Sequence, residues 1–203
     1  MKKKTKVAIK QTIVVATVLI AIIVVVSFVA NNRLEQLREP MVSDAVLQYK
    51  PLIEKYAEDY QVANYVDVLL AMMMQESGGR GDDPMQSSES YCGEVGCIDD
   101  PELSIKQGVY YFSETLAAAN YDLELAIQSY NFGKGFIHYV METSGYYTQD
   151  IAIAFSKEMY ENAPDQSIYS CLREEAKQYN ACYGDIYYVR SVMNYVDSLT
   201  EKQ

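Results

Sequence analysis

The sequence predicts an all-α fold that is preceded by a single apolar helix at the N-terminus. Apolar residues recur at helical spacing along most of the chain, and strand-like alternation of apolar and polar residues is nearly absent. Residues 13–30 form an uncharged run whose only polar residues are Thr17 and Ser27. The remaining length suits one helical domain with its own core, placed beyond a membrane segment.

The N-terminal run is long enough to act as a signal anchor. With Thr12 at its head it approaches the roughly 20 apolar residues that usually span a bilayer. Five lysines precede it, which favours a cytoplasmic N-terminus. A cleaved signal peptide is the alternative, but the run is longer than the usual signal core and Phe28 lies where a small residue is expected before Ala30. We therefore expect a single-pass protein of the cell membrane with its folded domain on the extracytoplasmic side. The expected order is a cytoplasmic basic segment (1–11), the anchor (12–30), a linker (31–41) and the folded domain (42–203).

Helices are expected at intervals along the folded domain. The first falls within residues 44–60, where Pro51 is tolerated if a new helix starts there. Asn64 can cap the next helix, and Gly78-Gly79 can end it. Residues 78–100 are rich in Gly, Ser and Asp and are expected to form a long functional loop. Asp100-Pro101 and Ser104 offer starts for the helix after it. The later helices are expected at residues 105–119, 122–130, 148–160, 170–179 and 187–199.

Glu76 stands at the end of an apolar helical segment that begins at Tyr65 and contains one other charged residue, Asp67. Its position in the last turn, near the negative end of the helix dipole and against an apolar wall, disfavours the charged carboxylate. A carboxyl group that keeps its proton near neutral pH can protonate a leaving-group oxygen. Glu76 is therefore a candidate general acid; a solvated glutamate at a helix end is the alternative.

Charge and cysteine content exclude several classes of function. All 28 acidic residues follow residue 30, and so acidic a domain is a poor surface for nucleic acid. The cysteines form two close pairs, Cys92 with Cys97 and Cys171 with Cys182, which predict two disulfides in an oxidising compartment. His138 is the single histidine, so zinc-dependent chemistry lacks its usual ligands. We expect no metal and no cofactor.

Four motifs follow one another in a fixed order. They are Glu76-Ser77, Pro84-Met85-Gln86-Ser87-Ser88, Gly108-x-x-Tyr111 and Gln128-Ser129-Tyr130-Asn131-Phe132-Gly133. This order resembles that of goose-type lysozymes and lytic transglycosylases. The stretch 83–90 and the segment 183–195 are also similar to the lysozyme-like domain of bacterial cell-wall hydrolases from conjugative elements. The resemblance covers residues 42–195.

The resemblance implies a lysozyme-like helical domain with a glycan cleft, in which Glu76 takes the place of the catalytic acid. Gln86 and Tyr130 with Asn131 match positions that line the cleft. Independently of the resemblance, a Tyr-Asn turn offers a ring for a sugar face and an amide for its hydroxyl or acetamido groups; core packing and helix capping are the alternatives. The remaining candidates for substrate binding are Ser77, which can orient the acid, Ser87 and Ser88 in the loop, and Tyr91 as a sugar platform.

One departure from the family pattern concerns the second carboxylate. Goose-type lysozymes have an aspartate two residues after the glutamine of the Met-Gln turn, where this chain has Ser88. Hydrolysis usually needs two carboxylates, and Asp82, Asp83 and Glu89 are the candidates, of which we prefer Glu89. Alternatively, Glu76 acts with a group of the substrate itself, as lytic transglycosylases are thought to do.

These observations predict a membrane-anchored enzyme that cleaves the β-1,4 bond between N-acetylmuramic acid and N-acetylglucosamine in peptidoglycan. A lytic transglycosylase that gives anhydro-muramic products is the first alternative. A non-catalytic wall-binding or channel-assembly protein on a lysozyme scaffold is the second, although binding alone does not need a proton donor. The expected partners are peptidoglycan strands, the membrane and a secretion or conjugation apparatus.

Overall fold

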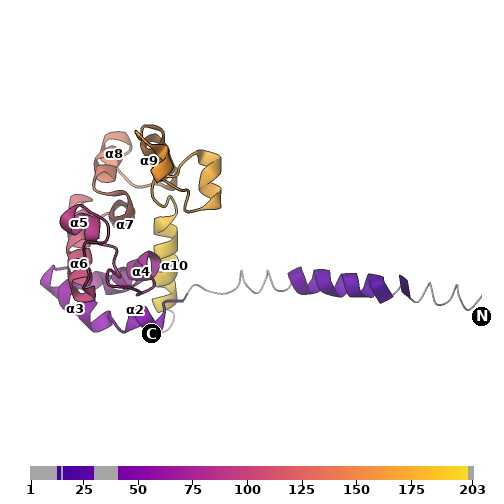
Figure 1. The fold of residues 1–203 in the computed structure, drawn as a ribbon. Coiled ribbons are helices and arrows are strands. Elements are labelled where there is room, and N and C mark those ends of the chain that lie inside the picture. Colours follow the sequence, from indigo (N-terminus) through magenta and orange to yellow (C-terminus); the bar gives the residue numbers. More distant parts are fainter. Residues whose placement is uncertain (1–12, 15, 30–40, 201–203) are drawn as a thin grey trace, which may run out of the picture. The chain divides into compact units, whose positions relative to one another are not determined.

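A computed structural model describes residues 13–14, 16–29 and 41–200, coloured in Figure 1. In the described part of the chain all regular structure is helical and no strand occurs, as the sequence predicts. The chain divides into two compact units, Met1–Glu39 and Pro40–Gln203. The helices of the second unit are α2 (Asp44–Leu47), α3 (Lys50–Asp59), η1 (Ala63–Tyr65), α4 (Val66–Glu76), α5 (Ser88–Cys92), α6 (Pro101–Ala118), α7 (Leu123–Phe132), α8 (Gly135–Thr143), α9 (Gln149–Glu161), η2 (Gln166–Ile168), η3 (Glu174–Tyr179) and α10 (Tyr188–Thr200).

In the first unit, residues 13–14 and 16–29 are helical. The expected anchor at 12–30 includes positions 12, 15 and 30, and these lie outside the described residues. Where the chain is described, no helix combines the length and apolar character needed to cross a membrane. The expected basic segment 1–11 and nearly all of the expected linker also lie outside the described residues.

Three helix starts that the sequence predicts carry side-chain caps. Asp100 accepts hydrogen bonds from two backbone N–H groups at the start of α6, Asp122 from Leu125 N at 3.1 Å, and Thr148 from Ile151 N at 3.2 Å. Each cap satisfies N–H groups that have no partner within the helix. The expected cap at Asn64 is wrong, because Asn64 lies inside η1 and α4 begins after it without a side-chain cap.

Other elements differ from the sequence-based expectation. The long loop at 78–100 contains the short helix α5, and α8 follows α7 where no helix is expected. The expected α-helix at 170–179 is instead the short 3₁₀ helix η3. Cys171 is bonded to Cys182 in this region, and closing so short a loop is incompatible with a straight α-helix that runs through most of it.

Helix α4 lies at the centre of the second unit. Its residues Leu69 to Met73 are fully buried, and it contacts α2, α3 and α10. Figure 1 shows α8 and α9 gathered at one end of this unit, and α10 runs from that end past α4, which it contacts, to the opposite end. Gly78, at φ +66°, ends α4 by donating its N–H to Met73 O, as predicted. This termination leaves Glu76 in the last turn, at the edge of the core.

Gly108 on α6 allows two parts of the site to approach this helix closely. A Cβ at this position would lie 2.7 Å from the Cβ of Met85 and 2.9 Å from the hydroxyl oxygen of Tyr130. Both residues are buried or nearly so, so neither can move aside without disturbing the core. The glycine of the Gly-x-x-Tyr motif therefore brings the Met-Gln turn and α7 against the same face of α6.

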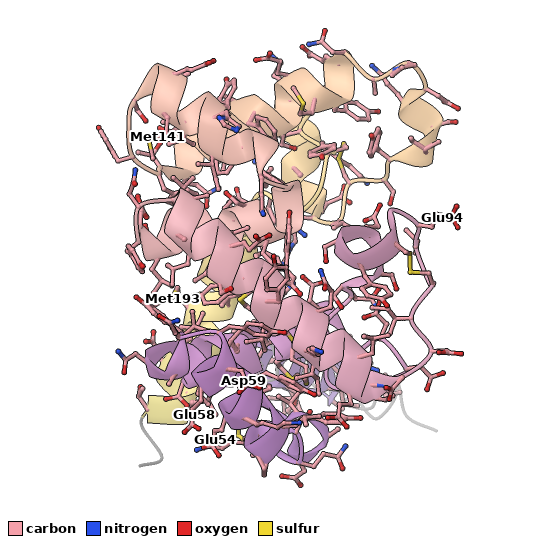
Figure 2. The ribbon with its side chains drawn as sticks, turned by 90° about the vertical axis from the view of Figure 1, so that its left-hand side faces the viewer. Glu54, Glu58, Asp59, Glu94, Met141 and Met193 are labelled. Carbon is pink, nitrogen blue, oxygen red and sulfur yellow. A yellow bond between two sulfur atoms is a disulfide. The ribbon has the colours of Figure 1, made fainter. Side chains whose placement is uncertain are left out.

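Both predicted disulfides are present, Cys92–Cys97 and Cys171–Cys182. Glu94 projects from the small loop that the Cys92–Cys97 disulfide closes (Figure 2).

The acidic character of the domain is visible on α3, where the exposed Glu54, Glu58 and Asp59 point outward (Figure 2).

Candidate active site

Two adjoining pockets form a groove between the loop after α4 and the end of α7. One has a volume of about 260 Å³, and the other, of about 220 Å³, has Glu76 in its wall. They share four lining residues: Gln86, Glu89, Tyr130 and Asn131. The first pocket also includes Tyr111 and Tyr183, and the second Asp83, Ser88 and Val95. The groove therefore joins a half-buried acid to a surface of aromatic rings and amides.

Glu76 is held by a tyrosine from the other end of the sequence. The hydroxyl of Tyr188, at the start of α10, donates to Oε1 of Glu76 at 2.5 Å, and the Tyr188 side chain is almost fully buried. Burial away from water raises the pKa of Glu76 from 4.5 to about 7, and the hydrogen bond from Tyr188 opposes part of the rise. The negative charges of Asp83 and Asp185 raise it further. Near neutral pH this carboxyl group is thus poised between its two protonation states.

Asp83 is an ionised carboxylate in the same pocket. Its Oδ1 accepts hydrogen bonds from the Ser104 hydroxyl at 2.6 Å and from Ser87 N at 2.9 Å. Its Oδ2 accepts from the hydroxyl of Ser88 at 2.6 Å and from its N–H at 3.1 Å. Burial alone would raise the pKa of Asp83, but these hydrogen bonds outweigh it and hold the pKa below its ordinary value. Four short hydrogen bonds occupy the lone pairs of a carboxylate, so Asp83 keeps its charge and anchors the loop.

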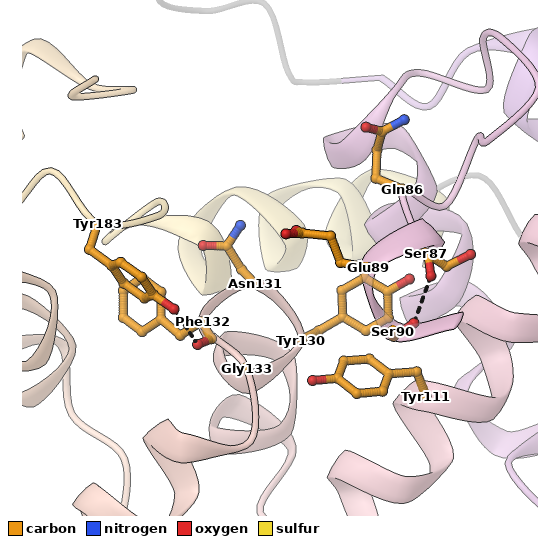
Figure 3. Close-up of a pocket in the computed structure, with 10 residues that line it drawn as sticks. All are labelled: Gln86, Ser87, Glu89, Ser90, Tyr111, Tyr130, Asn131, Phe132, Gly133 and Tyr183. Atoms are coloured by element: carbon orange, nitrogen blue, oxygen red, sulfur yellow. Dashed lines mark hydrogen bonds between the residues drawn. The ribbon is translucent and has the colours of Figure 1, made fainter. Parts of the chain in front are cut away.

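Glu89 and Asp82, the other two candidates for the second carboxylate, lie in different surroundings. Glu89, on α5, is exposed but lines both pockets, and its side chain extends toward Asn131 (Figure 3). Asp82 is exposed and does not line either pocket. The structure thus brings Asp83 and Glu89, but not Asp82, to the groove that contains Glu76.

The three serines expected to bind substrate use their hydroxyls within the protein. Ser77 donates to Pro84 O at 2.7 Å and accepts from Gly79 N at 3.0 Å, so it fixes the loop and does not orient Glu76. Ser87 donates to the carbonyl of Ser104 at 2.9 Å. Ser88 donates its hydroxyl hydrogen to Oδ2 of Asp83. Ser87 lines the first pocket and Ser88 the second, whereas Ser77 lines neither.

Gln86 and Tyr91 occupy the exposed part of the loop. Gln86 lines both pockets and has a positive φ of 48°, a conformation that is uncommon outside glycine and is often found at functional sites. Its side-chain N–H₂ group donates to Asp83 O at 2.7 Å, and its side-chain carbonyl oxygen accepts no hydrogen bond from the described residues. Tyr91 is 53% exposed and does not line either pocket.

Tyr130 and Asn131 at the end of α7 serve both packing and the groove. Tyr130 donates its hydroxyl hydrogen to Met85 O at 2.9 Å, and its ring and that of Tyr111 form a T-shaped pair with 5.5 Å between centroids. Asn131 accepts a hydrogen bond from Asp185 N at its Oδ1, at 2.8 Å. The other side of its amide is the N–H₂ group, which lies toward the groove. Both residues line the two pockets.

Sequence reasoning did not identify Tyr188, Tyr111, Tyr183 or Asp185 as parts of the site. Tyr188 belongs to an amphipathic helix whose pattern predicts burial. Nothing local indicates that its hydroxyl reaches a carboxyl 112 residues away in the chain. The tyrosine of the Gly-x-x-Tyr motif, Tyr111, offers the clearest sequence signal, because it falls one turn beyond Gly108 on the same face of α6.

The helical fold and the half-buried Glu76 beside a groove of tyrosines and amides place this chain in the class of lysozyme-like proteins. Residues 43–196 match the Lysozyme-like family, and the chain belongs to that family. It is similar to the "Uncharacterized membrane protein YocA" of Bacillus subtilis (strain 168), with 38% identity over 165 residues that cover 79% of this chain and 72% of YocA.

Two further relatives are longer proteins. The "Bifunctional muramidase/DL-endopeptidase CwlT" of the same Bacillus strain is 38% identical over 155 residues, which cover 76% of this chain and 43% of CwlT. A crystal structure of a protein similar to lipoprotein of the NLP/P60 family, from Staphylococcus aureus subsp. aureus Mu50, has a TM-score of 0.67 and 40% identity. The match covers 77% of this chain and 54% of that structure. This chain thus spans about half the length of these two relatives.

Proposed function

We propose that this protein is a membrane-anchored peptidoglycan glycosidase that cleaves the β-1,4 bond between N-acetylmuramic acid and N-acetylglucosamine. The observation that carries the proposal is the raised pKa of Glu76, about 7, at the wall of a groove that can accept sugars. Membership of the lysozyme-like family supports the same reading. So does the similarity to CwlT, whose name describes a muramidase.

In this proposal Glu76 protonates the glycosidic oxygen as the bond breaks. Its proton must be present before the reaction and must leave easily during it, and a pKa near the working pH meets both needs. Tyr188 holds one carboxyl oxygen, Oε1, and leaves the other for the substrate. Because the donor is held by a buried side chain, little reorganisation is needed when the glycan binds.

The positive charge that develops on the sugar ring calls for a negative group nearby. Asp83 supplies a permanent charge in the same pocket as Glu76, but its four short hydrogen bonds make it a poor base. Glu89 has no hydrogen bond to its carboxylate among the described residues, so it is free to hold a water. We therefore assign charge stabilisation to Asp83 and activation of water to Glu89.

The groove residues supply sugar recognition. Tyr111 and Tyr130 present an edge-to-face pair on which a pyranose face can pack. The amide N–H groups of Asn131 can donate to an acetamido carbonyl, and the side-chain carbonyl of Gln86 can accept from a sugar hydroxyl. N-acetylated sugars match this mixture of rings, donors and acceptors.

A lytic transglycosylase is the second candidate function. The saturated hydrogen bonding of Asp83 favours it if Glu89 does not act as a base. Once Glu76 has given its proton to the leaving oxygen, its carboxylate can take the proton of the 6-hydroxyl of the muramic acid, which attacks the anomeric carbon in place of water. The product would then be an anhydro-sugar. Glu76 has the same role as proton donor in both reactions.

The cellular setting is part of the proposal. The apolar run at residues 12–30 and the similarity to YocA, whose name describes a membrane protein, support an anchor with the lysozyme-like domain (42–203) facing the wall. An enzyme held there would open peptidoglycan close to the membrane, where a secretion or conjugation apparatus needs a passage.

The proposal is tested by mass spectrometry of purified glycan strands after incubation with the full-length protein. We expect disaccharide units with free muramic reducing ends, and the Glu76→Gln variant should release none. Anhydro-muramic ends would instead identify a transglycosylase with the same acid. If the wild-type protein sediments together with the glycan strands but leaves them uncut, it is a wall-binding protein and the enzymatic proposal is rejected.

A further inference from the structure

A buried carboxylate outside the groove, that of Asp185, connects the proton donor to the substrate-facing amide. Asp185 is 3% exposed and lies in the turn before α10, three residues from Tyr188. It does not line either pocket, so it cannot itself touch a bound glycan there. Its contacts nevertheless reach both functional ends of the site.

The first connection runs to Glu76. The carboxylate of Asp185 accepts from Tyr187 N at 2.9 Å, and its main-chain carbonyl accepts from Tyr188 N at 3.1 Å. These bonds fix the first turn of α10, which carries the Tyr188 hydroxyl to Glu76. The same carbonyl of Asp185 accepts from the buried side chain of Gln128 on α7 at 3.0 Å, so the turn is tied to a second helix.

The second connection runs to Asn131. The N–H of Asp185 donates to Oδ1 of Asn131 at 2.8 Å, which sets the direction of the amide and turns its nitrogen to the groove (Figure 3). Gly184, at φ +61°, makes the close approach possible, because a Cβ there would lie 2.7 Å from the same Oδ1. Asp185 thus acts on both ends of the site. Its side chain and carbonyl hold the turn that brings Tyr188 to Glu76, and its N–H orients the side-chain amide of Asn131.

A buried carboxylate needs a countercharge, and Arg173 supplies it. Its Nε and Nη2 donate to the two oxygens of Asp185 at 2.6–3.1 Å, and its Nη2 also donates to the Ser191 hydroxyl at 2.8 Å. This fork-shaped contact is the strongest type of ion pair. Arg173 is carried by the loop that the Cys171–Cys182 disulfide closes, so the covalent closure limits how far the arginine can move from Asp185.

Resting on the proposed function, we propose that Asp185 is a positioning residue for glycan cleavage and that Arg173 is the partner that keeps it in place. Losing Arg173 leaves an unpaired charge beneath the groove, and the turn must shift to reach water. Tyr188 and Asn131 would move with it. A displacement of about 1 Å at a catalytic group can cost about 100-fold in rate.

The test compares variants of two basic residues in the same loop of the full-length protein, Arg173 and Lys177. Lys177 is paired with Glu174 at 2.6 Å and is exposed, so Lys177→Gln is the matched control for Arg173→Gln. Arg173→Gln is expected to lower kcat by about 10- to 100-fold, with Arg173→Lys intermediate and Lys177→Gln within about twofold of the wild type. Thermal unfolding identifies any variant that is not folded, and Arg173→Lys then takes the place of Arg173→Gln.

Two readouts separate positioning from a merely structural role. Asp185→Asn should be non-additive with Tyr188→Phe, because the two act through one contact with Glu76. It should also move the high-pH limb of activity to lower pH, since the charge of Asp185 raises the pKa of Glu76. The other polar groups facing Glu76 are Tyr188, Tyr130 and Asp83, and they are unchanged in this variant.

Wild-type cleavage by folded Arg173→Gln and Asp185→Asn, with an inactive Glu76→Gln, would overturn the positioning proposal and leave the proposed function intact. Additive losses with an unmoved pH limb would overturn it as well. Cleavage by Glu76→Gln would instead remove the proposed function, on which this inference rests.

Discussion

The Glu76→Gln variant is expected to lose glycan cleavage while it keeps its fold. Glutamine has the shape of glutamate and accepts the same hydrogen bond from Tyr188, but it has no proton to give. General acid catalysis contributes about 10²–10⁴-fold, so the rate should fall by at least that factor. The rate of release of reducing ends from purified glycan measures the effect.

Stability and substrate binding provide the controls for this variant. Removing a group that is buried with a raised pKa should leave the unfolding midpoint unchanged or higher, because the charged form no longer has to be accommodated. Glu54→Gln, on the exposed face of α3 and away from the groove, should cleave as the wild type does. If Glu76→Gln still cleaves at more than about a tenth of the wild-type rate, the proton donor is another residue.

The Asp83→Asn variant is expected to lose both activity and stability. Asparagine keeps one acceptor oxygen, so the donors now shared by Oδ1 and Oδ2 cannot all be satisfied. Leaving a buried donor without a partner costs about 1–3 kcal/mol. The loop that carries Gln86 and Glu89 should loosen, and the negative charge beside the reacting sugar is lost. We expect a large fall in kcat together with a lower free energy of unfolding, measured by denaturant titration.

Glu89→Gln separates the two carboxylates at the groove. The carboxylate of Glu89 accepts no hydrogen bond from the described residues, so replacing it should leave the free energy of unfolding unchanged. If it activates water, hydrolysis slows strongly while glycan binding survives. If Glu89→Gln cleaves normally and anhydro-muramic products appear, no protein base is needed and the transglycosylase reaction is the correct one.

The sequence allows most of the helices to be predicted because their starts are encoded locally. Asp100, Asp122 and Thr148 each combine a capping side chain with an apolar pattern that follows. Helix α8 lacks such a signal, since Lys134 precedes it without a capping hydrogen bond. In the segment at 170–179 the apolar spacing favours an α-helix, but the Cys171–Cys182 disulfide requires a compact loop there. The spacing of apolar residues carries no information about this constraint.

The sequence indicates Glu76, the proposed proton donor, but not the residues that hold it in place. Glu76 is recognisable from the apolar run before it and the glycines after it. Tyr188 and Asp185 are distant in sequence and reach the site only through the packing of α10 against α4. Ser77 shows the opposite error: its position beside the acid suggests contact, yet its hydroxyl is directed at Pro84 O. Adjacency in sequence is a weak guide at a helix end, because successive side chains point in different directions.

The pH dependence of kcat/KM is the sharpest test of Glu76 as the proton donor, since it reports the pKa of the acid in the free enzyme. Because Glu76 must be protonated to act, activity should fall as the pH rises through its pKa of about 7. A high-pH limb near this value, shifted downward in Asp185→Asn, is the expected result. Activity that stays constant from pH 5 to about 9 would rule out Glu76 as the proton donor, because a donor with a raised pKa near 7 cannot remain protonated over that range.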